Sequence, residues 1–242
     1  MLCSDCGQEI KPVVCLDIDG TLGDFHGHLI EFAKQYFQYD PVIGTHGRYD
    51  GGERMRHWFT RTFACTLGEY HNMKLAFRQG GLKRSMPTLD HPWILTQDLK
   101  TALGVEIWLT TTRPYLRFDS VDPDTRFWLK HNNIYYDYLL YDENKYRKLA
   151  ELIDRRRVVT ILDDLSEELE NAEVIYGDEV CVLRRSSYNR YYWKRWRGFD
   201  RREDIFGFIR ERVNRWNEGA AEQASVSAPG GGSDLPEAEP SS

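Results

Sequence analysis

The sequence predicts an α/β protein in which helices cover both faces of a parallel sheet and a small, mostly helical cap is inserted after the first strand. Short apolar segments alternate along the chain with segments whose apolar residues recur three or four positions apart, and this alternation is typical of parallel sheets. A long segment of weak periodicity interrupts the alternation after the first apolar segment. Acidic residues follow the ends of two apolar segments, where such folds bind ligands.

Four segments are predicted to be buried strands because each is short, apolar and rich in β-branched or aromatic residues. They are residues 12–16, 105–109, 158–162 and 180–183. Five further segments carry apolar residues at helical spacing, and several of them begin after Asp, Ser or Pro. These are residues 31–37, 92–103, 125–130, 145–153 and 166–171. The alternating order of strands and helices favours a parallel sheet whose connecting helices lie on both of its faces.

These patterns divide the chain into four parts. Residues 1–11 contain a CxxC pair, and residues 12–28 and 86–216 form the predicted core. Residues 29–85 hold Gly clusters, aromatic residues and basic residues in a segment much longer than a crossover needs, which predicts an inserted cap. Residues 217–242 consist mainly of Pro, Gly, Ser, Ala and Glu, and a composition with so little to bury predicts disorder.

Composition argues against several classes of protein. The chain of 242 residues has no apolar run near the roughly 18 residues that a membrane span needs, and its N-terminus does not read as a secretory signal. Its five cysteines do not form the pattern of a disulfide framework, so we expect a cytoplasmic protein. The formal net charge of -6 gives no overall signal for nucleic-acid binding. The oligomeric state stays open.

Carboxylates follow two of the predicted strands. Asp17 and Asp19 come after the first strand, and Asp163 and Asp164 come after residues 158–162. Because the carboxyl ends of parallel strands meet at one edge of a sheet, we expect the four side chains to converge there. They would repel one another unless a cation lay among them, and oxygen ligands favour Mg²⁺. The four acids are therefore the predicted metal-binding residues.

The first acidic pair also has the arrangement that covalent catalysis needs. A carboxylate can act as a nucleophile and form an aspartyl-phosphate. Alternation along an extended chain puts Asp17 and Asp19 on the same side, so that one can attack while the other transfers protons. Gly20 permits a tight turn out of the strand, and Thr21 supplies a hydroxyl and favours the start of a helix.

The segment VVCLDIDGT, residues 13–21, resembles the hhhhDxDGT signature of the haloacid dehalogenase (HAD) superfamily of phosphohydrolases, and later motifs follow in that family's order. The resemblance implies a Rossmann-like core, a phosphatase with Asp17 as nucleophile, and proton transfer by Asp19. It also implies a Mg²⁺ held by Asp17, the Asp19 backbone carbonyl and one acid of the later pair. Of that pair we favour Asp164 over Asp163.

Two shorter motifs are similar to the family's phosphate-binding motifs. In LTTTRP, the resemblance implies a Thr that binds the transferred phosphoryl group; we favour Thr111 over Thr110, with Arg113 as a further phosphate contact. In DENKYRKLAEL, it implies a Lys that offsets negative charge, and we favour Lys145 over Lys148. The resemblance covers about residues 12–30 and 90–185 and leaves the cap and both ends unexplained.

The predicted cap should select the substrate, because it covers the residues that carry out the chemistry. Arg54 and Arg56 lie among aromatic residues, and this combination could clamp a phosphate and stack on a base. The alternative is a solvated helix face with buried aromatic residues. The general layout looks most like the 5′(3′)-deoxyribonucleotidase branch and related phage nucleotide phosphatases, so we expect hydrolysis of nucleoside monophosphates.

Two alternative functions depend on the chain outside these motifs. Residues 184–216 interleave Arg with aromatic residues, which favours nucleic acid as a partner and a polynucleotide 3′-phosphatase, unless the aromatic residues pack on the core. Cys3 and Cys6 form half of a zinc-site pattern, which would fit a non-catalytic scaffold that binds nucleic acid or protein. The intact acids Asp17 and Asp19 argue against such a scaffold.

Overall fold

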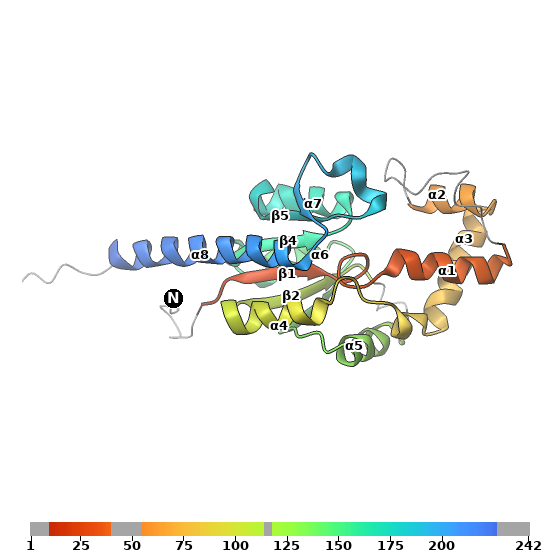
Figure 1. Ribbon diagram of the computed structural model, residues 1–242, viewed down its shortest axis with the longest axis horizontal. Coiled ribbons are helices and arrows are strands. Elements are labelled where there is room, and N and C mark those ends of the chain that lie inside the picture. The colour runs from red at the N-terminus through yellow and green to blue at the C-terminus, as the bar shows by residue number, and fades with distance from the viewer. Residues whose placement is uncertain (1–9, 40–54, 114–117, 227–242) are drawn as a thin grey trace, which may run out of the picture.

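A six-stranded sheet runs through the centre of the protein, with the strand order β3-β2-β1-β4-β5-β6 and every neighbouring pair parallel (Figure 1). The structure is a computed structural model, and it describes residues 10–39, 55–113 and 118–226. The strands are β1 (Val13–Asp17), β2 (Glu106–Thr111), β3 (Tyr138–Tyr141), β4 (Val158–Asp163), β5 (Cys181–Arg184) and β6 (Arg197–Phe199). The predicted parallel α/β fold is confirmed.

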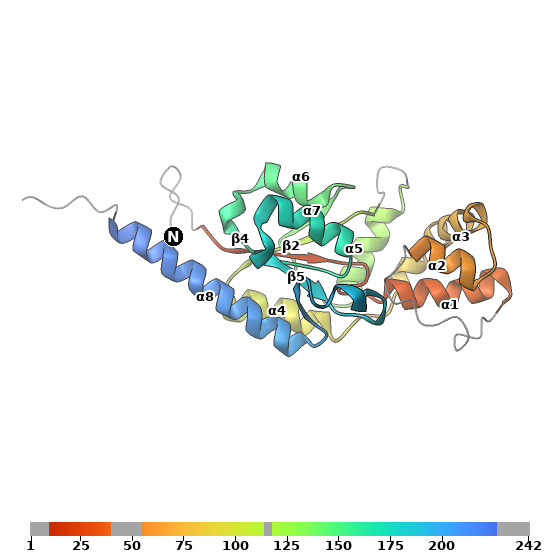
Figure 2. The ribbon, with the colours of Figure 1, turned by 90° about the horizontal axis from the view of Figure 1, so that it is seen from above.

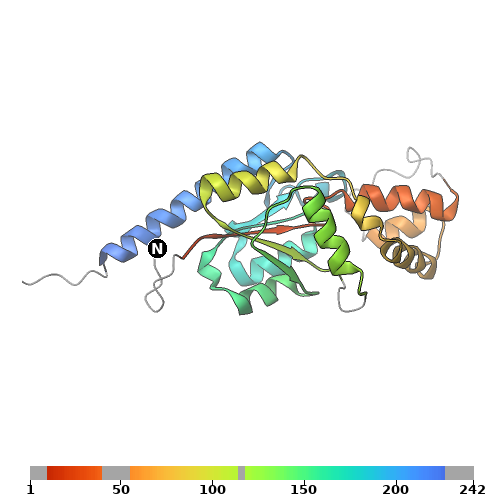
Figure 3. The same ribbon diagram turned by 90° about the horizontal axis from the view of Figure 1, so that it is seen from below.

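Helices cover both faces of this sheet (Figures 2 and 3). One face packs on α4 (Pro92–Leu103), α5 (Val121–His131) and α8 (Arg202–Val226), and the other on α6 (Lys145–Leu152) and α7 (Ser166–Tyr176). Side chains alternate between the two faces along each strand. In β1, Val14 and Leu16 therefore join the core beneath α4 and α8, while Val13 and Cys15 join the core beneath α6 and α7.

The cap follows β1 and lies beyond the carboxyl ends of the strands (Figure 2). It consists of α1 (Phe25–Phe37), α2 (Met55–Thr62), α3 (Leu67–Gln79) and the short 3₁₀ helix η1 (Leu82–Ser85). The cap has a hydrophobic core of its own, which contains Leu29, Ala33, Trp58, Phe59, Phe63, Tyr70, Met73 and Phe77. A mostly helical cap inserted after the first strand, as predicted, is confirmed.

Several elements differ from their predicted bounds. The strands β3 and β6 were not predicted, because β3 lies at a sheet edge with half-exposed side chains and β6 has only three residues. Helix α1 begins at Phe25, where the Asp24 side chain caps it by accepting from the Gly27 N–H at 2.9 Å. Helix α5 begins at Val121 and α7 continues to Tyr176. The missed first part of α1 includes Gly27 and two histidines, and that of α5 includes Pro123 between two acids, and none of these residues adds to an apolar helical pattern.

The C-terminal helix is longer than the sequence indicates. Helix α8 continues to Val226, so residues 217–226 are helical where disorder was expected. Ile205, Ile209 and Val213 bury the first half of α8 against the core, and Ala, Glu and Gln in the second half favour continuation of a helix that has already formed. The remaining tail lies outside the described residues.

The N-terminal cysteine pair also lies outside the described residues. Within them, Cys15, Cys65 and Cys181 are free thiols. Among the helices that the structure describes, none combines the length and the apolar character required to cross a bilayer.

Candidate active site

Three of the predicted acids meet where β1 and β4 end. Asp17 is the last residue of β1, Asp163 is the last residue of β4, and Asp164 follows it. The two strands are neighbours in the sheet, and each of the three acids offers a carboxylate oxygen within 4.8 Å of the others. All three side chains are buried. The parallel topology therefore brings together acids that are far apart in the sequence.

Lys145 provides positive charge to this group of acids. It is the first residue of α6 and is 1% exposed, and its Nζ lies 2.5 Å from Asp17 Oδ1 and 2.6 Å from Asp163 Oδ2. Burial disfavours its charge, but the carboxylates of Asp163 and Asp17 outweigh burial and raise the pKa of Lys145. By contrast, Lys148 is exposed and pairs with Glu151 at 2.9 Å. Of the two lysines considered, Lys145 is the one at the site.

The buried acids need more positive charge than Lys145 supplies. Burial raises the pKa of Asp17 well above its ordinary value; Lys145 opposes this rise, while Asp163 and Asp164 add to it. Burial also raises the pKa of Asp163. A divalent cation bound by oxygen ligands would keep these carboxylates ionised, so the residues present fit a Mg²⁺ site.

Asp164 is held from both the cap and the core. Its Oδ2 accepts a hydrogen bond from the Tyr188 hydroxyl at 2.5 Å and lies 3.2 Å from His26 Nε2. Its Oδ1 accepts from the Thr21 hydroxyl at 3.4 Å, and its backbone carbonyl accepts from Asn189 Nδ2 at 2.9 Å. Neither His26 nor Tyr188 was predicted as a site residue.

The turn after β1 requires a glycine. Gly20 has a φ of +99°, a conformation that disfavours side chains. A Cβ atom at this position would lie 2.2 Å from Asp164 Oδ2 and 2.7 Å from the Tyr188 hydroxyl oxygen. The absence of a side chain lets the turn pass directly beside Asp164.

Asp19 lies outside the cluster of three acids and is bound by two cations. Arg113 donates from Nε to Oδ2 at 2.9 Å and from Nη2 to Oδ1 at 2.5 Å, and Lys83 of η1 donates to Oδ2. Burial disfavours the ionised form, but Arg113 and Lys83 outweigh it and hold the pKa of Asp19 far below its usual range. Arg113 was predicted as a phosphate contact, whereas Lys83 was not predicted.

The threonines of β2 differ in their surroundings. Thr110 lies opposite Asp17 in the parallel pairing of β1 and β2. Its hydroxyl is buried without a hydrogen-bond partner among the described residues. The Thr111 hydroxyl instead accepts from the Arg113 N–H at 3.3 Å. Thr110 is thus the threonine beside Asp17 whose hydroxyl has no partner among the described residues, whereas the Thr111 hydroxyl is engaged.

Other predicted contact residues lie elsewhere. Arg54 falls outside the described residues, and Arg56 lies on α2, where its Nε is 3.3 Å from Nε2 of the adjacent His57. No contact of Arg56 with the acids is recorded among the described residues. In the basic aromatic segment, Trp196 is buried in the core and Arg195 stacks on its ring at 4.4 Å. Trp196 therefore packs on the core, as the alternative to nucleic-acid binding expects, while Arg195 is exposed and pairs with Glu170 at 2.5 Å.

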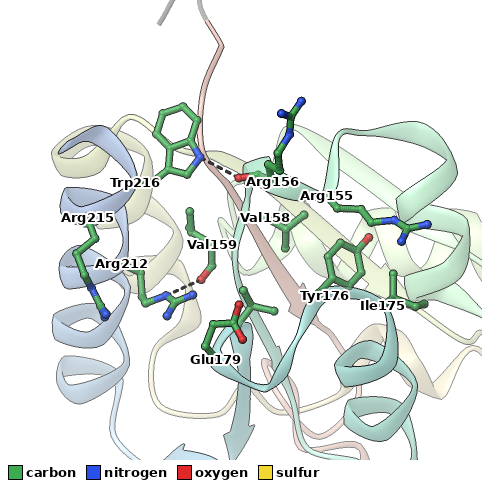
Figure 4. A pocket seen from close by; sticks show the side chains of 11 residues that line it. Arg155, Arg156, Val158, Val159, Ile175, Tyr176, Glu179, Arg212, Arg215 and Trp216 are labelled. Atoms are coloured by element: carbon green, nitrogen blue, oxygen red, sulfur yellow. Dashed lines mark hydrogen bonds between the residues drawn. The ribbon is translucent and has the colours of Figure 1, made fainter. Parts of the chain in front are cut away.

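A separate pocket of about 480 Å³ lies near the other end of β4 (Figure 4). Its lining consists of Arg155, Arg156, Val158, Val159, Ile175, Tyr176, Glu179, Val180, Arg212, Arg215 and Trp216. Val158 begins β4 and Asp163 ends it, which separates them by about 16 Å along an extended strand. This pocket is therefore distinct from the site of the acids.

Comparison with known proteins supports the fold. No protein-family model and no curated protein matches the sequence. A β-phosphoglucomutase candidate from Thermotoga maritima has a similar structure, with a TM-score of 0.57 at 14% identity over 83% of this chain and 99% of that chain. A HAD-superfamily hydrolase of subfamily IA from Geobacter sulfurreducens gives a TM-score of 0.53 at 14% identity, over 83% and 97% of the two chains.

A third similar structure contains a ligand. CbbY from Rhodobacter sphaeroides, in a mutant form in complex with xylulose-1,5-bisphosphate, gives a TM-score of 0.51 at 16% identity, over 79% of this chain and 95% of that chain. At such low identities the three comparisons establish the fold alone. The protein therefore has the fold of the HAD hydrolases, in agreement with its strand order and inserted cap.

Proposed function

We propose that the protein is a Mg²⁺-dependent phosphomonoester hydrolase that forms an aspartyl-phosphate on Asp17. The observation that carries this proposal is the position of Asp17, buried at the end of β1 with Lys145 at 2.5 Å and two further acids close by. A carboxylate paired with an ammonium group and placed at the sheet edge can attack a bound phosphoryl group. The fold shared with HAD hydrolases supports the same reaction class.

The reaction would proceed in two steps. In the first, an Asp17 oxygen bonds to phosphorus, the bond from phosphorus to the leaving oxygen breaks, and Asp19 donates a proton to that oxygen. In the second, Asp19 takes a proton from water, the water oxygen bonds to phosphorus, and the Asp17–phosphorus bond breaks to release phosphate. Lys145 and the Thr110 hydroxyl would stabilise negative charge on the phosphoryl oxygens.

Asp19 must leave its ion pairs before it can transfer protons. As an ionised group bound by Arg113 and Lys83, it cannot donate a proton. We therefore assign proton transfer to a state in which substrate groups have taken over at least one of these two cations.

The Mg²⁺ site would use the clustered acids. Asp17 and Asp164 would bind the ion through their side chains and Asp19 through its backbone carbonyl, because the Asp19 carboxylate is taken by Arg113 and Lys83. Asp163, which accepts from Lys145 and from the Tyr146 hydroxyl at 2.6 Å, would position these groups. A bound Mg²⁺ supplies Lewis-acid stabilisation of the charge on the phosphoryl group.

The substrate is proposed to be a small phosphorylated molecule in the cytoplasm. Nucleoside monophosphates follow from the sequence resemblance, and sugar phosphates are added because CbbY was solved with a sugar bisphosphate. We favour these two classes of small molecule over nucleic acid as the substrate, since residues of the basic aromatic segment such as Trp196 pack on the core.

Phosphate release from a panel of phosphomonoesters tests this proposal. The panel contains p-nitrophenyl phosphate, nucleoside monophosphates, sugar phosphates and a 3′-phosphorylated oligonucleotide, each measured with Mg²⁺ and with EDTA. We expect Mg²⁺-dependent release that Asp17→Asn abolishes while the circular dichroism spectrum is unchanged. Asp178→Asn, an exposed acid in the 3₁₀ turn before β5, is the matched control and should keep full activity. Substantial turnover by Asp17→Asn would exclude the covalent mechanism.

A further inference from the structure

Two buried basic side chains, Lys83 and Arg113, bind Asp19 at the junction of the cap and the core, and two more basic residues, on α3, interact electrostatically with this group. We call them the cation cluster: Lys74 and Arg78 of α3, Lys83 of η1, and Arg113 after β2. Lys83 is 7% exposed and Arg113 is 4% exposed. Both donate to the Asp19 carboxylate, and Lys83 also lies 4.5 Å from the centre of the Phe25 ring. The two best-buried members therefore come from opposite sides of the junction.

The charges of the cluster act on one another. The positive charges of Arg113 and Arg78 act against the charge of Lys83, while its ion pair with Asp19 stabilises that charge. Burial lowers the pKa of Lys74 to about 8, with Arg78 adding to this effect and Asp19 opposing it. The Asp19 carboxylate stabilises the charge of both lysines. Positive charge is thus concentrated in a poorly solvated place.

The nearby acid Asp124 does not relieve this excess. Its Oδ1 lies 2.6 Å from Nε of Arg84, the residue that follows Lys83. Arg84 therefore has a carboxylate partner of its own, while the described contacts of Lys83 and Arg113 with a carboxylate are those with Asp19.

We propose that the cation cluster binds a second anionic group of the substrate, a phosphate or a carboxylate, in addition to the phosphoryl group transferred at Asp17. This inference rests on the proposed function and narrows its substrate class to phosphomonoesters with a second anionic group. The Asp19 carboxylate shows how such a group is held, because the planar guanidinium of Arg113 binds both of its oxygens.

The position of the cluster links recognition to catalysis. An anionic substrate group at Lys83 and Arg113 competes with Asp19 for the same donors and releases its carboxylate towards the leaving oxygen. The same group bridges η1 of the cap and the end of β2 in the core. A substrate with a second anion therefore gains in binding and in proton transfer, whereas a simple monoester gains neither.

Matched pairs of substrates test the inference. They are adenosine 3′,5′-bisphosphate with adenosine 5′-monophosphate, glucose 1,6-bisphosphate with glucose 6-phosphate, and 3-phosphoglycerate with glycerol 3-phosphate. In at least one pair we expect kcat/KM to be roughly tenfold to a hundredfold higher for the member with the second anion, the usual effect of a charged hydrogen bond. Equal kcat/KM within every pair would overturn the inference.

Variants of Lys83 test whether the cation cluster causes the higher kcat/KM of substrates with a second anionic group. Lys83→Met should lower the ratio of kcat/KM within the preferred pair by roughly tenfold, whereas Lys83→Arg should retain most of it because the charge is kept. Lys148→Met, which removes an exposed lysine on α6, is the control and should leave the ratio unchanged. An equal loss for both members of the pair in Lys83→Met would show a purely structural role and contradict the inference. Circular dichroism of each variant checks the fold.

Binding without turnover separates this inference from the proposed function. Turnover of p-nitrophenyl phosphate that depends on Asp17 tests the hydrolase itself. If no compound is hydrolysed, the proposed function fails, and calorimetric titration of the same pairs in EDTA still decides the inference. Tighter binding of the member with the second anion, lost in Lys83→Met and kept in Lys83→Arg, would support the cluster as an anion site. Equal binding of both members would overturn it.

Discussion

The inner and outer halves of the site carry opposite charge. In the inner half, Asp17, Asp163 and Asp164 lie around one lysine, Lys145. In the outer half, Lys83 and Arg113 of the cation cluster bind one carboxylate, that of Asp19. In the proposed mechanism, a divalent cation would add positive charge to the inner half, and the second anionic group of a substrate would add negative charge to the outer half. A phosphorylated molecule with such a group would then contact both halves at once.

Removal of Lys145 should break the inner half most strongly. Lys145→Met leaves Asp17 and Asp163 buried without their ammonium partner, so we expect kcat to fall roughly 100-fold to 1000-fold. Without Mg²⁺, the free energy of unfolding should fall by about 3–5 kcal/mol, the typical cost of breaking a buried ion pair. Steady-state kinetics and urea unfolding measure the two effects. Lys148→Met is the control, and a Lys145→Met protein as active as this control would contradict the assigned role.

The turn after β1 separates the two halves, and Gly20 in this turn can be compared with Gly104 at the end of α4, because both glycines have a positive φ. Gly20→Ala places a Cβ against Asp164 at a φ of +99°, whereas Gly104→Ala has a φ of +62° and open space around its Cβ. We expect a loss in unfolding free energy of about 1 kcal/mol for Gly104→Ala, and roughly 2–4 kcal/mol for Gly20→Ala together with loss of activity. Urea unfolding of the two variants measures these losses in unfolding free energy. Equal losses would mean that the contact with Asp164 carries no cost.

Stability of the inner half should depend on pH in opposite ways with and without Mg²⁺. Burial raises the pKa of Asp17 and of Asp163 in the folded protein above that of the unfolded chain. Each group therefore stabilises the fold while protonated, and that contribution is lost as the pH rises through the raised value. Mg²⁺ binds the ionised form, so the increase in Tm on adding Mg²⁺ should grow as the pH rises above the ordinary range of a carboxyl group. An increase in Tm that is the same at all pH values would contradict this coupling, and Asp163→Asn should weaken the pH dependence.

The smallest expected effect is the difference in kcat between Thr110→Val and Thr111→Val. Thr110→Val removes a buried hydroxyl without a recorded partner, so stability should change little while kcat falls roughly tenfold. Thr111→Val removes the acceptor of the Arg113 N–H and should affect kcat less. Thermal unfolding and initial rates of the two variants provide the comparison. A larger loss of kcat in Thr111→Val would return the phosphoryl contact to Thr111.

The sequence predicts the inner half of the site better than the outer half. Asp17, Asp163 and Asp164 each end a strand or follow one, so local apolar patterns and the rule that parallel strands share an edge are sufficient to bring them together. Lys83 and His26 reach the site only because the cap folds back over the sheet. Their approach depends on packing between segments that are far apart in the sequence, and no local pattern encodes it.

The same reason explains the differences in the fold. The strands β1, β2 and β4 lie in the middle of the sheet and are apolar along nearly their whole length, which makes them visible in the sequence. The strand β3 lies at the edge with half-exposed tyrosines, and β6 is an Arg-Gly-Phe segment that pairs with β5. Such strands are defined by their neighbours more than by their own composition.

Detection of the phosphorylated intermediate tests the central claim most directly. Protein mixed with Mg²⁺ and p-nitrophenyl phosphate is quenched in acid within one turnover, digested and analysed by mass spectrometry. The p-nitrophenolate group leaves without a proton, so Asp19→Asn is included to slow hydrolysis of the intermediate without slowing its formation. We predict a phosphorylated peptide that contains Asp17, more abundant in Asp19→Asn than in the unmodified protein and missing in Asp17→Asn. Turnover without any phosphorylated Asp17 peptide, or a phosphoryl group on another residue, would contradict the account.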